Sequence, residues 1–373
     1  MSVNQKILSG DGVYEQLDAY WEQEGIRHIL LVCGRSAKKL PVYHYFEELD
    51  RSGKVRVTQF SDYAPNPDYS SVEKGTALFR EKGCDAVAAI GGGSGMDVAK
   101  CIKLYAGMDP EVSYLQQKIV PNDIPFLAVP TTAGTGSEAT RFAVVYYNHE
   151  KQSVSDESCI PSVVIMDPSV LDTLPLYQSK TTMLDPLCHA TESFWSVNSS
   201  PESKAFSRTA IEEILKHKDG YLANTPEGNA GMLHAAYIAG QAINLTQTTA
   251  GHAMCYKLTS MYGLSHGHAA ALCVAQLWPF MLTHPERCID PRGEGYLQDT
   301  YREIALAYGF EKPEEACAYF GKMLEDMDLP IPEGVREEDF EVLTHSVNPV
   351  RLKNHPAALD EEVIRKLYHR ILG

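Results

Sequence analysis

The sequence of 373 residues has few basic residues for its number of acidic ones. Lysine and arginine together number 33 against 49 aspartates and glutamates, which gives a formal net charge of −16 at pH 7. Binding to nucleic acid normally requires a basic surface that displaces counterions from the phosphates, so we expect no nucleic-acid partner. A local group of cations can still bind a small anionic substrate, because charges at short range outweigh the sum over the chain.

The sequence also lacks an apolar run that could span a bilayer. The longest such run, residues 269–282, is interrupted by Gln276 and Pro279 and is shorter than the roughly 20 residues of a transmembrane helix. The first residues lack the apolar stretch of a signal peptide. The nine cysteines include no Cys-x-x-Cys pair, and most lie in apolar segments such as residues 30–33. We therefore expect a cytoplasmic protein with reduced thiols and no membrane association.

The first half of the chain alternates between strand-like and helix-like segments. Apolar or β-branched runs predict strands at residues 29–33, 55–60, 85–90, 125–130 and 163–167, and amphipathic spacing predicts a helix at 70–82. Such alternation is typical of a parallel sheet covered by helices on both faces. Helical spacing dominates later, at residues 203–216, 231–244, 251–261, 269–282, 297–308, 314–327 and 361–372. The sequence thus predicts an α/β domain over residues 1–177 and an all-helical domain over residues 178–373.

Residues 91–100 (Gly-Gly-Gly-Ser-Gly-Met-Asp-Val-Ala-Lys) form a glycine-rich segment between a predicted buried strand and a helix. The segment has neither the Gly-x-Gly-x-x-Gly spacing of a standard dinucleotide fold nor the Gly-Lys-Ser/Thr of a P-loop. Glycines let a backbone approach a ligand closely, and a helix N-terminus offers free N–H groups to phosphate. A tight turn without a ligand is the alternative, but three consecutive glycines before a serine favour phosphate binding.

A second loop rich in glycine and hydroxyl groups follows the next predicted strand, at residues 131–138 (Thr-Thr-Ala-Gly-Thr-Gly-Ser-Glu). Two such loops after parallel strands would line one crevice at the carboxyl edge of the sheet, where ligands bind in α/β folds.

The predicted helical domain contains a set of residues typical of metal ligands. Asp185 and His189 stand four residues apart and so share one face of a helix, with Asp185 as the N-cap and Pro186 in the first turn. His252 and His266 lie in two further helical segments. One carboxylate and three imidazoles suit iron or zinc. From these residues alone, a core histidine at 189 and a simple helix cap at 185 stay open as the alternative.

Together these segments resemble the iron-containing (group III) alcohol dehydrogenases, from Leu30 to about Pro356. The matching motifs also include Asn66-Pro67 after the second strand and Asp167-Pro168 at the end of the first domain. The resemblance implies the fold shared with dehydroquinate synthase, and it implies Fe²⁺, or alternatively Zn²⁺, bound by Asp185, His189, His252 and His266. It implies a nicotinamide cofactor bound by Gly34, Arg35, Ser36, Asn66, Gly92, Gly93, Ser94, Asp97, Thr131, Thr132, Thr135 and Lys151.

Two positions depart from the pattern of this family. Many members have a histidine four residues after the third ligand, where this chain has Tyr256. Tyr256 and Lys257 are the candidate catalytic residues. A tyrosine with a pKa near 10 is a poor base, so the alternative for Tyr256 is a packed aromatic side chain without a catalytic role. Members that prefer NAD often have an aspartate at the end of the first strand. Here Gly34 is followed by Arg35 and Ser36, which suit a 2′-phosphate, so we expect NADPH to be preferred over NADH.

Residues 252–259 and 348–354 resemble the phosphonoacetaldehyde reductase-like branch of the family. Four cations are candidate contacts for an anionic substrate group, and for each the alternative is a surface charge or an ion pair: Arg141, Lys257, Arg351 and Lys353. The expected function is NAD(P)H-dependent reduction of a short-chain aldehyde to a primary alcohol, with phosphonoacetaldehyde and 2-hydroxyethylphosphonate as the candidate pair.

Two other functions stay open. One is dehydrogenation of small neutral alcohols or diols, of the lactaldehyde or propanediol type. The other is a lyase of the dehydroquinate synthase type, against which the complete Asp-His-His-His set speaks. We expect a small-molecule aldehyde or alcohol as the partner, and a homodimer.

Overall fold

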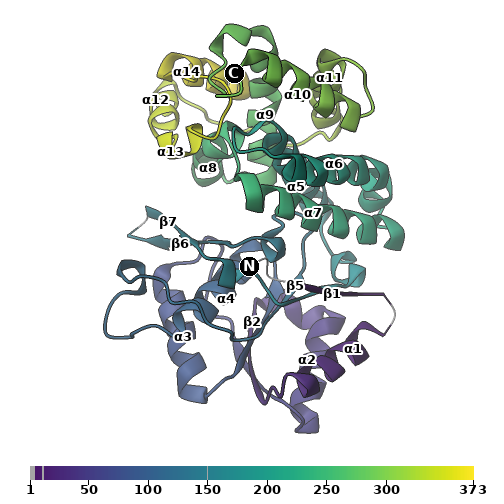
Figure 1. Cartoon of the computed structure of the whole chain (residues 1–373), viewed down its shortest axis with the longest axis vertical. Helices are drawn as coiled ribbons and strands as arrows, with labels where there is room; N and C mark the ends of the chain where they lie inside the picture. The colour runs from purple at the N-terminus through teal and green to yellow at the C-terminus, as the bar shows by residue number, and fades with distance from the viewer. Residues whose placement is uncertain (1–4, 11, 149) are drawn as a thin grey trace. The chain divides into compact units, whose positions relative to one another are not determined.

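The computed structural model describes residues 5–10, 12–148 and 150–373. The chain forms two compact units, Met1–Thr173 and Leu174–Gly373 (Figure 1). The sequence placed the boundary after residue 177. The division falls earlier because α5 (Leu176–Trp195) is one continuous helix, and its first turn belongs to the helical unit.

The N-terminal unit is built on a parallel sheet of six strands in the order β1-β8-β5-β4-β2-β3. The strands are β1 (Lys6–Ser9), β2 (His28–Cys33), β3 (Arg56–Phe60), β4 (Ala86–Gly91), β5 (Phe126–Pro130) and β8 (Val163–Met166). Residues of β2 and β5 are buried throughout, as expected for strands covered on both faces. The predicted α/β architecture is confirmed.

The order of the strands reverses between β2 and β4. The chain runs from β2 outward to β3, and then returns to β4 on the other side of β2. In open parallel sheets, ligands bind at the carboxyl ends of the strands at such a reversal. The fold therefore directs attention to the loops that follow β2 and β4.

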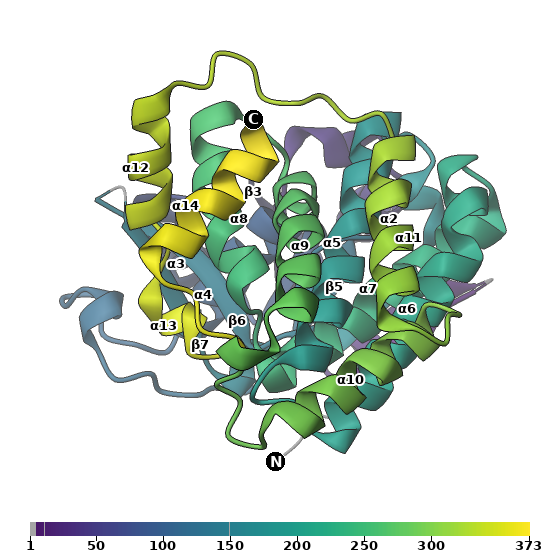
Figure 2. The same cartoon turned by 90° about the horizontal axis from the view of Figure 1, so that it is seen from above.

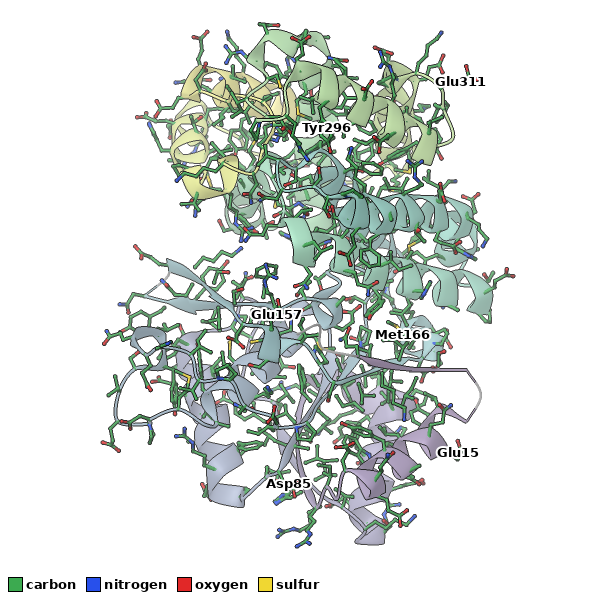
Figure 3. All side chains as sticks on the ribbon, in the orientation of Figure 1. Glu15, Asp85, Glu157, Met166, Tyr296 and Glu311 are labelled. Carbon is green, nitrogen blue, oxygen red and sulfur yellow. The ribbon has the colours of Figure 1, made fainter. Side chains whose placement is uncertain are left out.

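Helices and a hairpin complete this unit. The helices are α1 (Val13–Gln23), α2 (Pro41–Ser52), α3 (Tyr69–Lys82), α4 (Gly93–Tyr105) and the short η1 (Arg35–Lys39), η2 (Tyr114–Gln116), η3 (Ser137–Ala139), η4 (Glu157–Cys159) and η5 (Pro168–Leu171). Asp85 fixes the start of β2 beside β4, because its carboxylate accepts from the backbone N–H groups of Arg27 and His28 at 3.0–3.2 Å (Figure 3). The sequence did not predict β1 or the antiparallel pair β6 (Phe142–Tyr147) and β7 (Glu150–Ser155).

All regular elements of the C-terminal unit are helices in its described residues. Its helices are α5, α6 (Pro201–Leu222), α7 (Pro226–Thr246), α8 (Ala250–Tyr262), α9 (His266–Thr283), η6 (Pro285–Arg287), α10 (Glu294–Ala307), α11 (Pro313–Asp326), α12 (Glu337–His345), α13 (Pro349–Leu352) and α14 (Glu361–Leu372). The apolar helix α9 contacts α5, α8, α11 and α14 (Figure 2). Across the described parts of both units, no helix combines the length and apolar character needed to cross a membrane.

One local prediction about this unit is wrong. Asp185 is not an N-cap, because α5 runs without a break from Leu176 to Trp195 and contains Pro186 in its interior. An interior proline costs one helical hydrogen bond and strains the preceding turn. Helix α6 packs against α5, and Thr182, in the preceding turn, shares a hydrogen bond of 3.0 Å with the hydroxyl of Tyr221 on α6.

Candidate functional site

The predicted phosphate loop lies at the carboxyl end of β4, and α4 begins directly after it. Gly92 is the N-cap of α4, and no described side chain caps this end of the helix. The first N–H groups of α4 are therefore available, and with the helix dipole they favour a phosphate. Ser94 accepts a hydrogen bond of 3.3 Å from the backbone N–H of Asn66, so these two predicted residues are brought together.

The second predicted loop packs against the first. The backbone N–H of Thr131 donates to the last carbonyl of β4 at 3.1 Å. A Cβ atom added to Gly92 would lie 3.1 Å from Oγ1 of Thr132, and one added to Gly93 would lie 3.1 Å from Cγ2 of Thr135. The two loops are thus in contact, and glycine at these positions lets the side chains of Thr132 and Thr135 pack closely against the first loop.

Asp97 and Lys100 connect α4 to the end of the second loop and to the segment that follows it. Asp97 accepts from the hydroxyl of Ser137 at 3.4 Å, and burial raises the pKa of Asp97 to about 6 although Lys100 and Lys151 act in the opposite direction. The ammonium of Lys100 donates to the backbone carbonyl of Ser137 in the second loop and to those of Thr140 and Phe142 after it, at 2.6–2.7 Å. Lys100 therefore anchors the second loop to α4, a role that the sequence did not predict.

The end of β2 presents a different chemistry. Gly34 follows the strand, and Arg35 and Ser36 begin η1 with exposed side chains. No carboxylate among the described residues pairs with Arg35. Tyr63 was missed: its hydroxyl would lie 3.8 Å from a Cβ atom on Gly34 and 2.9 Å from one on Gly95. Tyr63 thus lies between the end of β2 and the first turn of α4, and its place in the proline-rich loop after β3 was the available signal.

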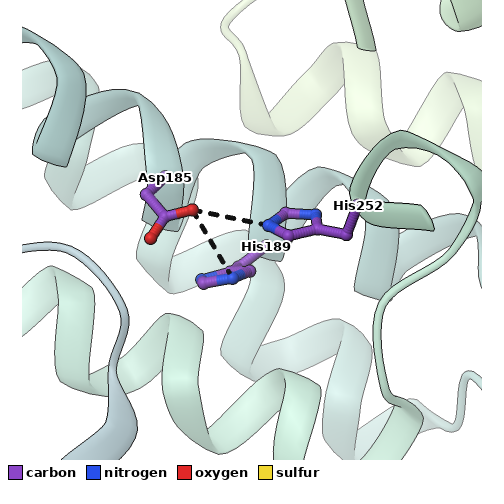
Figure 4. Close-up of side chains that lie close together, drawn as sticks. All are labelled: Asp185, His189 and His252. Carbon is purple, nitrogen blue, oxygen red and sulfur yellow. Dashed lines mark hydrogen bonds and ion pairs between the residues drawn. The ribbon is translucent and has the colours of Figure 1, made fainter. Parts of the chain in front are cut away.

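Helices α5, α8 and α9 bring the four predicted metal ligands together. Oδ1 of Asp185 lies 3.4 Å from Nε2 of His252 and 3.7 Å from Nε2 of His189 (Figure 4). Nε2 of His266, at the start of α9, lies 3.9 Å from the same oxygen. Ligands bonded to a tetrahedral metal at about 2.1 Å are separated by about 3.4 Å. The donor atoms of Asp185, His189 and His252 all lie within 4.8 Å of one another, so these three residues could hold a divalent cation, with His266 beside them.

The electrostatics of Asp185 and His189 agree with this fit, whereas at His252 burial lowers the pKa but Glu192 and Asp185 outweigh it and raise the pKa to about 9 in the absence of a cation. Burial alone would raise the pKa of Asp185, but the neighbouring histidines lower it below its ordinary value, so the carboxylate is ionised. Burial lowers the pKa of His189 to about 3, so its imidazole is neutral and has a lone pair to offer. Separations of 3.4–3.9 Å are too long for good hydrogen bonds. A cation placed among the buried donors of Asp185, His189 and His252 could bind all three at once.

Glu192 also belongs to this cluster, although the sequence analysis did not predict a role for it. It is fully buried on α5, and its carboxylate contacts Nδ1 of His252. The spacing of Asp185, His189 and Glu192 places all three on one face of the helix. That spacing was the signal that could have found it.

Tyr256 and Arg351 lie next to the cluster. The ring of Tyr256 stacks on His266 with the ring centroids 5.5 Å apart. The guanidinium of Arg351 lies 5.4 Å from the centre of the Tyr256 ring and donates to Oγ1 of Thr248 at 3.1 Å. Lys257 is the next residue of α8 and is partly exposed. In the described part of the chain, no carboxylate lies within ion-pair distance of Arg351 or Lys257.

The other two candidate cations are placed differently. Arg141 forms an ion pair of 3.0 Å with Glu157 in the N-terminal unit (Figure 3). Lys353 is exposed at the end of α13. Arg351 and Lys257 are therefore the better candidates for binding an anion beside the metal cluster.

Comparison with known proteins agrees with this geometry in both units. The family model described as iron-containing alcohol dehydrogenase matches residues 4–168, and the model of the C-terminal part of the Fe-containing alcohol dehydrogenase family matches residues 179–372. The chain belongs to the iron-containing alcohol dehydrogenase family. As a member of this family it is an oxidoreductase, and the predicted resemblance is confirmed.

Relatives of this chain include enzymes named for different substrates. Phosphonoacetaldehyde reductase of Streptomyces viridochromogenes is 31% identical over 297 residues, which cover 76% of this chain and 75% of the relative. Alcohol dehydrogenase 4 of Schizosaccharomyces pombe is 28% identical over 347 residues, which cover 90% of this chain and 80% of the relative.

Solved structures of the same family share the fold. The crystal structure of sulfoacetaldehyde reductase from Bifidobacterium kashiwanohense in complex with NAD⁺ has a TM-score of 0.86 and 25% identity, and the match covers 99% of this chain and 97% of that one. A 1,3-propanediol oxidoreductase has a TM-score of 0.87 and 25% identity, with coverage of 98% and 97%.

Proposed function

We propose that this enzyme reduces a short aldehyde that carries a strongly anionic group, with phosphonoacetaldehyde as the candidate substrate and 2-hydroxyethylphosphonate as the product. The observation that carries the proposal is the position of Arg351, whose guanidinium lies over the ring of Tyr256, which in turn stacks on His266. A cation without a carboxylate partner among the described residues is thus one aromatic ring away from the metal cluster. The relatives named phosphonoacetaldehyde reductase and sulfoacetaldehyde reductase support the proposal, because both names specify an aldehyde that bears an oxyanion.

The chemistry divides between the bound groups and the chain. When bound, Fe²⁺ (or Zn²⁺) polarises the carbonyl oxygen and NADPH supplies the hydride. The donors that would hold the metal are Asp185, His189, His252 and His266. The loops after β4 and β5 would hold the cofactor through the N-terminus of α4 and the hydroxyl groups of the second loop.

We assign Arg351 and Lys257 to the anionic end of the substrate. A guanidinium can bind an oxyanion through two parallel hydrogen bonds, which fixes the direction of the aldehyde as well as its position. Tyr256 contacts both His266 and Arg351 through its ring. We therefore infer that Tyr256 keeps these two residues in place, because tyrosine in general has a pKa near 10 and is a poor base.

The direct test compares aldehydes on the Fe²⁺-loaded enzyme. NADPH oxidation is followed with phosphonoacetaldehyde and with propanal, which has a similar chain but no charge. We expect kcat/KM to be at least about 10-fold higher for the anionic aldehyde, since hydrogen bonds to charged groups contribute about 1.5–3 kcal/mol.

Other outcomes of this test would favour the alternative functions. Turnover of neutral aldehydes alone would contradict the proposal and favour a dehydrogenase of small alcohols or diols, an alternative consistent with the likeness to 1,3-propanediol oxidoreductase. No reduction of any aldehyde by enzyme that holds both metal and cofactor would favour a lyase of the dehydroquinate synthase type.

We also propose that NADPH is preferred over NADH, because Arg35 and Ser36 are exposed at the carboxyl end of β2. Arg35→Asp is expected to raise the KM for NADPH about 10-fold or more, through loss of a charge-assisted hydrogen bond and through repulsion of the 2′-phosphate. The KM for NADH should change little. Steady-state kinetics with both cofactors provide the measurement.

The matched control for this prediction is Arg51→Asp, which makes the same change of charge in the last turn of α2. It should leave the ratio of the two KM values as in the wild type. Equal effects of Arg35→Asp on both cofactors would contradict a role in binding the 2′-phosphate.

Finally, we propose a cytosolic homodimer. All nine cysteines are free thiols, which suits a reducing compartment. Strand β1 lies at an edge of the sheet, where unpaired backbone groups can bind a strand of a second copy.

A further inference from the structure

The three histidines of the metal cluster differ in the surroundings of their second ring nitrogen. Each directs Nε2 toward Asp185, so Nδ1 must carry the proton if Nε2 is to offer its lone pair to a cation. Nδ1 of His252 contacts the carboxylate of Glu192. Nδ1 of His266 lies 3.6 Å from Sγ of Cys255, and Nδ1 of His189 has no partner among the described residues. His252 thus differs from His189 in having a charged acceptor.

Glu192 is itself held firmly by the first turn of α8. Its Oε1 accepts from the hydroxyl of Thr249 at 2.6 Å and from the backbone N–H of Gly251 at 2.7 Å. These donors belong to a helix N-terminus, where N–H groups need acceptors and negative charge is stabilised. The carboxylate of Glu192 therefore links α5 to α8 through one oxygen, and its other oxygen contacts the ring of His252.

The surrounding residues leave a defined place for this carboxylate. Trp195 donates to Oγ1 of Thr249 at 2.9 Å, which leaves the proton of that hydroxyl for Glu192. A Cβ atom on Gly251 would lie 2.9 Å from Oε1 of Glu192 and 2.8 Å from Cγ2 of Val274, so only glycine fits without displacement. Glycine inside a helix costs about 1 kcal/mol relative to alanine. The chain has this unfavourable residue at Gly251, where the carboxylate of Glu192 approaches the backbone of α8.

We propose that Glu192 is a positioning residue that fixes the tautomer and the ring orientation of His252 and thereby sets the affinity of the cluster for its cation. This inference rests on the metal site of the proposed function. The position requires an acceptor on both sides, for Nδ1–H of His252 and for the N–H of Gly251. A glutamine side chain offers one acceptor oxygen and one donor nitrogen. In either orientation its NH₂ group would face a donor, so Glu192→Gln preserves the volume and removes the function.

The first experiment measures Zn²⁺ binding by the metal-free full chain, in competition with a chromophoric chelator. Glu192→Gln is expected to weaken binding about 10- to 100-fold, as loss of a hydrogen-bonding partner of a metal ligand typically does. The matched control is Glu213→Gln on α6. The carboxylate of Glu213 lies 3.1 Å from Nε2 of His217, a histidine that is not part of the metal cluster. The control should bind Zn²⁺ as the wild type does.

A second variant covers the case in which Glu192→Gln does not fold. Gly251→Ala retains the charge of Glu192 but displaces it, and we expect Zn²⁺ binding to weaken about 10-fold. Its control is Gly321→Ala on α11, where an added Cβ atom meets nothing within 4 Å. Loading with Co²⁺ adds a spectroscopic readout, because its visible bands depend on ligand geometry. These bands should shift in Gly251→Ala and not in Gly321→Ala.

The outcomes separate the two proposals. If the wild type binds Zn²⁺ and both Glu192→Gln and Gly251→Ala bind it equally well with unchanged Co²⁺ bands, Glu192 does not position His252. If the wild type itself binds neither Zn²⁺ nor Fe²⁺, the proposed metal site is wrong, and the role of Glu192 is overturned with it.

Discussion

Asp185→Asn is expected to abolish both metal binding and aldehyde reduction. The substitution keeps the shape of the side chain but removes the negative charge that lies 3.4–3.9 Å from three imidazole nitrogens. A metal that polarises a carbonyl contributes several kcal/mol to the transition state, so we expect kcat/KM to fall about 1,000-fold or more. Metal content per chain, measured by atomic emission, should fall in parallel. Cofactor binding, followed by NADPH fluorescence, should persist because its loops lie in the other unit.

The control for this prediction is Asp219→Asn, which changes an exposed carboxylate on α6 in the same unit. It should retain full metal content and activity. An Asp185→Asn protein that still holds one metal ion per chain would show that Asp185 is not a ligand, and the site would have to be sought elsewhere.

Arg351→Gln is expected to lower kcat/KM for phosphonoacetaldehyde about 30-fold or more. Truncation of one partner of a hydrogen-bonded charge pair costs about 2–5 kcal/mol, and the guanidinium has no carboxylate in the described residues that would hold it elsewhere. The same variant should reduce propanal nearly as well as the wild type does, because propanal has no charge to bind. Parallel kinetics with the two aldehydes measure the difference.

Arg365→Gln provides the matched control, since Arg365 forms an exposed ion pair with Glu337 on α12. It should leave both aldehydes unaffected. Equal losses with both aldehydes in Arg351→Gln would mean that Arg351 acts through Tyr256 and His266 rather than on the substrate.

The sequence predicted the parts of the fold whose signals are local. The strand before Gly92 is an unbroken apolar run, and the helix after it starts at glycines, so both elements could be placed from the residues alone. β1 has only four residues, and β7 is mostly polar, so neither has a hydrophobic pattern to recognise. The helix that passes through Pro186 was missed because contacts with α6 stabilise it, and the local sequence does not contain them.

For the candidate site as well, the residues marked by a local sequence signal could be predicted, and those that depend on contacts between distant helices could not. A carboxylate and a histidine four apart can be recognised on any helix, and family motifs supplied His252 and His266. Glu192 has no such local mark, because a glutamate within a helix is usually at the surface. The role of Glu192 depends on the approach of α8 to α5, which brings the N–H of Gly251 to its carboxylate. Arg351 likewise reaches Tyr256 only because α13 packs beside α8.

The donors of the cluster come from three helices, α5, α8 and α9, that are distant along the chain. An ion that binds these donors binds the folded chain and not the unfolded one, so each tenfold excess of free ion over its Kd adds about 1.4 kcal/mol to the free energy of unfolding. Without its ion the chain would lack this contribution, so metal-free enzyme should unfold at a lower temperature and be cleaved faster by a protease than enzyme loaded with Fe²⁺ or Zn²⁺.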